Sequence, residues 1–250
     1  MRASLELADG EIAVVAVAHG EPDANGARFA AVLSDDESAR ARRFHFERDR
    51  HAFVVSRGTL RLLLAAETGA PPASLAFARG ANGKPSLASG NPRDVRFNVS
   101  HSGGVTLLAF ARAREIGVDI EALRPLPERD AVARRFFSVA EADDLASLPE
   151  GERERAFFAC WTRKEAFIKA AGAGLGTFAL DRFRVSLRPG DAPRVLEIDG
   201  DAEAARDWNV HDIPAGSAYL AALAYAGAAR PVRCVALSER EVLARYGDAP

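Results

Sequence analysis

The stretch WTRKEAFIKAAG, residues Trp161–Gly172, holds two of the three lysines in this chain of 250 residues. The chain has 33 lysines and arginines together, so 30 of them are arginine. Because lysine is so rare here, each lysine is a candidate for a specific chemical role. Lysine is a compact point charge, whereas arginine is a wide planar fork. The stretch closes the longer segment ERERAFFACWTRKEAFIKAAG, which has the apolar spacing of an amphipathic helix and a glycine at its expected end. A long helix that carries both lysines is therefore the first predicted element.

One face of this helix combines charged and apolar side chains. By the three-and-four spacing rule, that face holds Trp161, Lys164, Glu165, Ile168 and Lys169. An exposed Glu165–Lys169 pair would be a common feature and would contribute only about 0.3–0.5 kcal/mol. Here, however, the charges interrupt an apolar stripe, which indicates the edge of a functional site.

The segment IGVDIE, residues 116–121, has the pattern of a strand with one apolar and one acidic face. Because strand side chains alternate, Asp119 and Glu121 share a face with Gly117 and lie roughly 6.5–7 Å apart at Cα. Two carboxylates at that spacing suit a hard divalent cation such as Mg²⁺, which binds oxygen ligands and leaves room for phosphates. A solvated strand face is the alternative for an isolated D-x-E pattern.

Two glycine-containing segments carry polar side chains that suit an anionic ligand. NVSHSGG, residues 98–104, places a Ser-His pair in an expected tight turn between two strands, where such donors can bind phosphate. A hydrolase is not indicated there, because no G-x-S-x-G elbow surrounds the serine. NGKP, residues 82–85, holds the third lysine, Lys84, in a second turn, where a compact ammonium fits a phosphate.

Helices and strands are both expected along the chain. A helix is predicted over residues 44–67 and ends at Gly69, and Ser138 with Glu141 forms a capping box at the start of another helix. We interpret Glu141 as a cap and nothing more. The segments GGVTLLAFARA and GSAYLAALAYAGA are each a small-residue turn followed by a strand of similar composition. This faint repetition favours two related α/β halves.

Composition bounds the class of protein. A chain of 250 residues with 48% hydrophobic and 27% charged residues is typical of a soluble globular protein of one large or two modest domains. A net charge of −2 gives no basic excess for nucleic acid, and the apolar run at residues 12–18 is too short to cross a membrane. Cys160 and Cys234 have neither disulfide nor metal-ligand spacing, which favours a reducing, cytoplasmic setting, and Cys160 is expected to pack in its helix.

The motifs GKP, FNVSHS, GVDIE, FFS..E and W..KEAFIK..G.GL, in this order, resemble the surfactin-synthetase-type 4′-phosphopantetheinyl transferases over residues 39–183. The resemblance implies an α/β (α+β) fold of two similar halves, an intramolecular pseudo-dimer with the cofactor cleft between them. We expect the halves to be residues 1–113 and 114–250. The resemblance further implies a monomer that transfers the 4′-phosphopantetheine arm of coenzyme A to a serine of an apo acyl or peptidyl carrier protein. That reaction uses Mg²⁺ and releases adenosine 3′,5′-bisphosphate.

The resemblance also assigns roles to individual residues. It implies that Glu165 is both a metal ligand and the general base for the carrier serine, and that Lys169 contacts the pyrophosphate. The other metal ligands that it implies are Asp119 and Glu121. The expected coenzyme A contacts fall into three groups. Arg40 is the basic phosphate contact. The adenine and 3′-phosphate loop consists of Arg79, Gly80, Ala81, Asn82, Gly83 and Lys84, and the phosphate- and nucleoside-binding turn holds Asn98, Ser100 and His101. The contacts of Lys164 stay open.

Two other functions use the same residues. A Mg²⁺-dependent hydrolase of coenzyme A or nucleotides would turn over without a carrier serine. A non-catalytic carrier-binding module has no need for the complete set Asp119, Glu121, Glu165 and Lys169. The carrier that is served, whether of fatty acid, polyketide or non-ribosomal peptide synthesis, stays open at this point.

Overall fold

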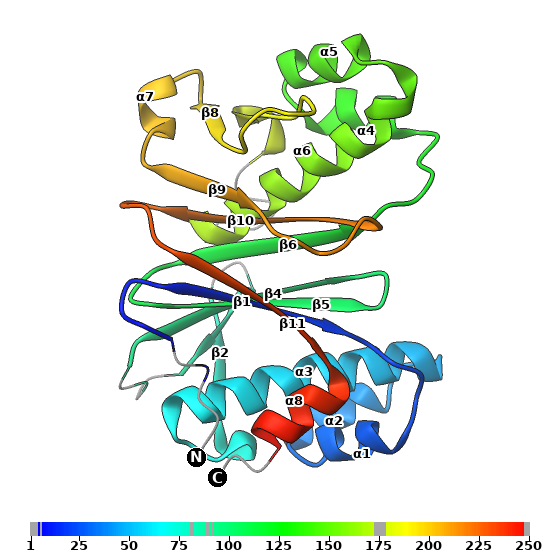
Figure 1. Cartoon of the computed structure of the whole chain (residues 1–250), viewed down its shortest axis with the longest axis vertical. Coiled ribbons are helices and arrows are strands. Elements are labelled where there is room, and N and C mark those ends of the chain that lie inside the picture. Colours follow the sequence, from blue (N-terminus) through cyan, green and yellow to red (C-terminus); the bar gives the residue numbers. More distant parts are fainter. Residues whose placement is uncertain are drawn as a thin grey trace.

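The computed structural model describes residues 5, 7–80, 83–88, 91, 93–172 and 179–247. Two β-sheets lie face to face in the middle of the molecule, and a layer of helices covers the outer face of each sheet (Figure 1). The first sheet has the strand order β11-β1-β5-β4, in which β1 and β11 are parallel and the other neighbours are antiparallel. Its strands are β1 (Ile12–Ala18), β4 (Val95–Ser102), β5 (Val105–Arg112) and β11 (Val232–Ser238).

The helical layer on the first sheet is built around one long helix. Its leucines Leu60, Leu63 and Leu64 pack against the apolar face of β1, and the helix ends at Gly69, which has a φ of 76°. The predicted helix over residues 44–67 and its glycine stop are thus confirmed, with the start three residues later. The elements of this layer and the hairpin beside it are α1 (Ala24–Ala30), α2 (Asp35–Ala41), α3 (Glu47–Thr68), α8 (Glu239–Tyr246), the 3-10 helix η1 (Pro72–Ser74), β2 (Phe77–Arg79) and β3 (Pro85–Leu87).

The second sheet is antiparallel and has the strand order β6-β10-β9. The long helix α6 (Glu150–Ala171) packs across it, as the lysine-bearing stretch predicts. The strands of this sheet are β6 (Ile116–Ala122), β9 (Trp208–Asp212) and β10 (Tyr219–Ala226). The remaining elements of the half are α4 (Arg129–Phe136), α5 (Val139–Ser147), the 3-10 helix η2 (Leu180–Arg182), β7 (Phe183–Val185), β8 (Val195–Ile198) and α7 (Ala202–Ala205).

Strand β6 and helix α6 touch backbone to backbone at Gly117. A Cβ atom added at Gly117 would lie 2.0 Å from the Ala166 carbonyl oxygen and 2.3 Å from the Ala170 nitrogen. Only glycine allows so close an approach. Because side chains two residues apart share a strand face, Asp119 then faces the same stretch of helix.

The two sheets share an apolar core between them, to which β1 and β5 contribute Ile12, Val14 and Leu107, and β6 contributes Val118 and Ile120. Beside this core, β4 of the first sheet lies next to β6 of the second. We call this line of contact the β4–β6 seam. It is the place where polar side chains of the two halves meet.

The expected fold of two α/β halves is confirmed. The repeated segments GGVTLLAFARA and GSAYLAALAYAGA form β5 and β10, and each of these strands has a neighbour on both sides in its own sheet. The chain path departs from a division into residues 1–113 and 114–250 in one respect. Strand β11 and helix α8 return to the first half, because β11 pairs with β1. No helix in the described part of the chain is long and apolar enough to cross a membrane.

Candidate active site

Three of the predicted site residues, Asp119, Glu165 and Lys169, come together at the β4–β6 seam. Strand β6 supplies Asp119, and helix α6 supplies Glu165 and Lys169 from successive turns of the face that passes Gly117. Strand β4 supplies Ser100 from the other half. The site therefore exists only because the two halves pack on one another.

Lys169 is held by three acceptors. Its Nζ lies 2.6 Å from Asp119 Oδ1, 3.2 Å from the Val118 carbonyl oxygen and 3.3 Å from Ser100 Oγ. The ion-pair partner of Lys169 is thus Asp119 on the neighbouring strand, not the helical neighbour Glu165. The side chain stays 27% exposed, so the ammonium can still reach a ligand.

Two carboxylate oxygens in this cluster are buried and have no hydrogen-bond partner among the residues that the structure describes. Asp119 is 5% exposed and Glu165 is 7% exposed. Asp119 Oδ1 accepts from Ser100 Oγ at 2.8 Å and from Lys169, whereas Asp119 Oδ2 and Glu165 Oε1 accept no hydrogen bond from the described residues. Burial raises the pKa of Glu165; Lys169 opposes this shift, and the carboxylates of Asp119 and Glu121 add to it.

The chemistry of these donors fits a hard divalent cation. Such a cation binds carboxylate oxygens that have no other partner, and Asp119 and Glu165 each supply one. Glu121 lies at the end of β6, and its Oε2 accepts from Ser102 Oγ at 3.0 Å and lies 3.4 Å from the Arg124 guanidinium. Across the residues that the structure describes, no group of three or more histidine, cysteine, aspartate or glutamate side chains is arranged to hold a metal ion. The metal triad Asp119, Glu121 and Glu165 stays a prediction.

The segment NVSHSGG differs from the expected turn. Strand β4 continues to Ser102, and the turn consists of Gly103 and Gly104. Asn98 and Ser100 are buried and face the seam, where Asn98 Oδ1 accepts from the Val118 N–H at 2.8 Å. His101 is exposed and points to the opposite face of the strand, because neighbouring strand residues alternate. The structure therefore brings two of the three expected ligand contacts together and separates His101 from them.

Lys84 lies at the edge of a pocket between the two halves. Its Nζ donates to Glu115 Oε2 at 2.7 Å and to the Ile116 carbonyl oxygen at 2.9 Å, just where β6 begins. The pocket has a volume of about 430 Å³ and is lined by Gly80, Lys84, Arg96, Glu115 and Gly172 among others.

The other predicted coenzyme A contacts lie around the β2–β3 turn and on α2. Gly83 donates its N–H to the Gly80 carbonyl oxygen at 2.9 Å, and the exposed Arg79 lies above this turn, 3.5 Å from the Gly83 carbonyl oxygen. Ala81 and Asn82 lie outside the described residues. Arg40 is exposed on α2, and its guanidinium lies 5.2 Å from the centroid of the Phe53 ring.

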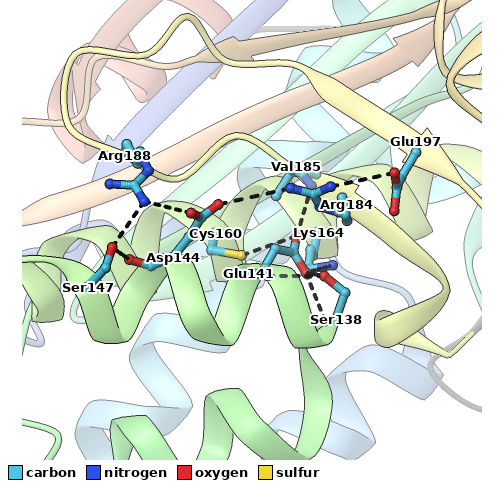
Figure 2. A network of polar contacts seen from close by, with 10 residues as sticks. All are labelled: Ser138, Glu141, Asp144, Ser147, Cys160, Lys164, Arg184, Val185, Arg188 and Glu197. Carbon is cyan, nitrogen blue, oxygen red and sulfur yellow. Dashed lines mark hydrogen bonds and ion pairs between the residues drawn. The ribbon is translucent and has the colours of Figure 1, made fainter. Parts of the chain in front are cut away.

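Lys164 belongs to a second, structural cluster (Figure 2). The side chain is fully buried, and its Nζ lies 2.7 Å from Glu141 Oε2 and donates to the carbonyl oxygens of Leu180 and Phe183 at 2.8 and 2.5 Å. The expectation that Lys164 shares the face of Glu165 and Lys169 is therefore wrong. Consecutive helix positions point about 100° apart, and both sides of α6 are covered.

Glu141 also does more than its predicted capping role. The capping box with Ser138 is present, but the carboxylate is 1% exposed, and its Oε1 accepts from the Val185 N–H at 2.8 Å. Glu141 thus joins α5, α6 and β7. Cys160 packs beside it as expected, fully buried, and burial raises the pKa of its thiol. The sequence carries the capping signal but no signal of the partner across the fold.

The comparison with known proteins agrees with the motifs and with this arrangement of two halves. Residues 115–224 match the 4′-phosphopantetheinyl transferase superfamily, and residues 21–113 match the 4′-phosphopantetheinyl transferase N-terminal family. The chain is 33% identical over 225 residues to the 4′-phosphopantetheinyl transferase HetI of Nostoc sp., covering 90% of this chain and 91% of that one.

Two further relatives match shorter parts of the chain. A putative 4′-phosphopantetheinyl transferase of Synechocystis sp., slr0495, is 40% identical over 147 residues, which cover 59% of this chain and 60% of that one. The 4′-phosphopantetheinyl transferase Sfp of Bacillus subtilis is 32% identical over 160 residues, which cover 64% of this chain and 69% of that one. Because the similarity to HetI runs through both halves and so includes every strand and helix of the seam, this chain belongs to the 4′-phosphopantetheinyl transferase superfamily.

Proposed function

We propose that this protein transfers the 4′-phosphopantetheine arm of coenzyme A to a serine of an acyl or peptidyl carrier protein. The observation that carries the proposal is the seam itself. A lysine ammonium on three acceptors lies beside two buried carboxylates, at the boundary of two halves that both belong to the family. Family membership supports the class of reaction, and the seam supports the residues that perform it.

In the proposed reaction the serine Oγ attacks the β-phosphorus of coenzyme A, and adenosine 3′,5′-bisphosphate leaves with the bridging oxygen. Glu165 accepts the serine proton. Its raised pKa suits this role, because a base is most effective when its pKa lies close to the working pH. Lys169 offers its ammonium to the negative charge that grows on the leaving oxygen, and Asp119 and Ser100 hold that ammonium in place. Catalysis of phosphoryl transfer consists mostly of such positioning and neutralisation.

Asp119, Glu165 and Glu121 would hold a Mg²⁺ ion. A bound Mg²⁺ supplies positive charge to the pyrophosphate and orients it. The protein's own contribution is to bury two of the three carboxylates, so that each presents an oxygen that no group in the described part of the chain satisfies.

We further propose that the pocket beside Lys84 receives the nucleotide end of coenzyme A. Gly80 and Lys84 of the first half line the pocket together with Glu115 and Gly172 of the second half. Glu115 and the Ile116 carbonyl take two of the three N–H donors of Lys84 Nζ, and the third is proposed to meet the 3′-phosphate. Arg40 and His101, both exposed on the first half, are proposed as outer phosphate contacts. We also propose that the protein acts as a cytoplasmic monomer.

Mass spectrometry of several apo carrier proteins tests the proposed function. Incubation with coenzyme A and Mg²⁺ should add the mass of the phosphopantetheine arm to at least one carrier. Asp119→Ala should abolish the addition, while Asp181→Ala, at an exposed site in η2, should leave it unchanged. Cleavage of coenzyme A without any carrier would instead favour the hydrolase, and carrier binding without a mass change would favour the binding module.

A further inference from the structure

Strand β4 contacts strand β6 through side chains in place of a backbone ladder. In the described residues no backbone register joins the two strands. Instead, three β6 amides at every second position, those of Val118, Ile120 and Ala122, donate to side-chain oxygens of β4 at 2.8, 3.4 and 3.1 Å. The acceptors are the Asn98 amide oxygen and the hydroxyls of Ser100 and Ser102.

The two hydroxyls each make a second bond to an acid of the proposed metal site. Ser100 accepts from the Ile120 N–H and donates to Asp119 Oδ1 at 2.8 Å. Ser102 repeats the arrangement two residues on: it accepts from the Ala122 N–H and donates to Glu121 Oε2 at 3.0 Å. A hydroxyl can do both at once, because it has one donor and two acceptor lone pairs.

The main chain at Ser102 is fixed against the end of β6. A Cβ atom at the next residue, Gly103, would lie 2.5 Å from the Ala122 Cβ, so the turn presses directly on β6. Tyr219 on β10 donates its hydroxyl to the Gly103 carbonyl oxygen at 2.5 Å. The Ser102 hydroxyl is thereby held at a defined place relative to β6.

We propose that Ser102 is a positioning residue for Glu121. This inference rests on the proposed function, in which Glu121 is one of the metal-binding acids. Asp119 is oriented by Ser100 and also by Lys169, and it is buried. Glu121 is 23% exposed at the strand end, and its other close partner is the exposed Arg124, 3.4 Å away. The Ser102 hydroxyl is the contact that holds the Glu121 carboxylate at the seam instead of turned toward solvent.

The test measures Mg²⁺ binding directly. Calorimetric titration of Mg²⁺ into the protein with coenzyme A present and no carrier should give a Kd three- to tenfold higher for Ser102→Ala than for the wild type. Ser102→Thr keeps the hydroxyl and should restore the wild-type Kd. The control is Ser74→Ala, which removes an exposed hydroxyl bonded to the Pro71 carbonyl and should change nothing. In the transfer assay, Ser102→Ala should raise the Mg²⁺ concentration for half-maximal rate by the same factor, with kcat at saturating Mg²⁺ changed less than twofold.

A second readout needs no metal. Amide hydrogen exchange of Ala122 in the metal-free protein should be faster in Ser102→Ala than in Ser102→Thr, because the N–H loses its acceptor. If Ser102→Ala does not fold, Ser102→Cys preserves the volume with a weaker donor and should weaken Mg²⁺ binding in the same direction. A folded Ala or Cys variant with the wild-type Kd for Mg²⁺ overturns the positioning role. Failure of the wild type to modify any carrier refutes the proposed function instead, and the Kd comparison still decides on Ser102.

Discussion

Glu165 is a buried acid, and the nearby Lys169 offsets only part of the cost of burying its negative charge. Its folded pKa is raised, so the folded state favours the protonated form, and stability falls as pH rises from the ordinary glutamate range through that raised pKa. We therefore expect Glu165→Gln to melt at a higher temperature than the wild type at pH 7.5 in metal-free buffer, although it is inactive. The difference between the two melting temperatures should shrink as the pH is lowered into the ordinary glutamate range, because protonation removes the buried charge of Glu165. Scanning calorimetry across this pH range checks it, and equal melting at pH 7.5 would contradict it.

The acceptors around Lys169 suit a compact ammonium group. Its three acceptors lie on β4 and β6 at 2.6–3.3 Å, and the planar fork of an arginine cannot meet them in the same way. We expect Lys169→Arg to lower kcat more than tenfold, a barrier increase of about 1.4 kcal/mol or more, and to change coenzyme A affinity less. Steady-state kinetics with a carrier, beside a coenzyme A binding isotherm, measures both. A silent variant would show that Lys169 serves only as a counter-ion for Asp119.

The sequence could identify which lysines were exceptional, but it could not separate their roles. Lys164 and Lys169 share a motif and a helix, yet one is fully buried against Glu141 and the other is at the seam. Helical spacing predicts which side chains are neighbours on α6. Helical spacing contains no information on which element covers each face of α6, and here the faces that carry Lys164 and Lys169 meet different elements.

The contact of β6 with α6 depends on a single missing side chain. Gly117→Ala would place a Cβ 2.0 Å from a backbone oxygen, a clash that no rotamer relieves. Overpacking of this kind costs about 1–3 kcal/mol and occasionally more, so for a clash with backbone atoms we expect a loss of about 3 kcal/mol in urea denaturation and weaker Mg²⁺ binding as Asp119 moves. Gly151→Ala, in the first turn of the same helix with nothing within 4 Å, is the matched control and should be slightly stabilising. Equal unfolding midpoints for the two variants would contradict the close packing.

The Glu141–Lys164 pair connects three elements of the second half. Lys164→Met would leave a carboxylate that is 1% exposed without its cation. Breaking a buried pair in this way costs about 3–5 kcal/mol. We expect that loss in chemical denaturation, with kcat per folded molecule unchanged at low temperature, because the pair lies outside the seam. A large fall in kcat with unaltered stability would return Lys164 to the catalytic site.

The polar strand β4 shows why local propensity misled at this element. Serine, asparagine and glycine are typical of turns, so NVSHSGG indicates a turn when only neighbours along the chain are considered. In the structure the side chains of Asn98, Ser100 and Ser102 take the place of backbone acceptors for β6. Tertiary contacts across the halves override the propensity, and a single sequence does not display those contacts.

Strand β11 and helix α8 complete the first half of the fold. Without β11, strand β1 would become an open edge, and the core would lose Leu237, Val242 and Leu243, which are all buried. We expect a truncation after Arg230 to be unfolded or aggregated in circular dichroism and gel filtration. A matched deletion that removes only residues 248–250 should fold. Native-like melting of the shorter variant would contradict the role of this strand.

The two-half architecture was predictable because a faint repeat and a run of family motifs extend through the chain. The crossing of β11 was not predictable from the same patterns. Parallel pairing with β1 joins Ile12 to Val232, which are 220 positions apart in the chain (232 − 12), and neither strand alone specifies its partner. Strand existence is a local property, whereas strand pairing over that distance is decided by the whole core.

This crossing also sets the order of events during synthesis on the ribosome. Strand β1 emerges early, but its parallel neighbour is translated only after the entire second half. The second half, whose sheet β6-β10-β9 is contiguous in the chain, can therefore fold while translation continues. Until β11 is made, the first sheet is left with β1 as an unpaired edge, which is a site for unwanted pairing with other chains.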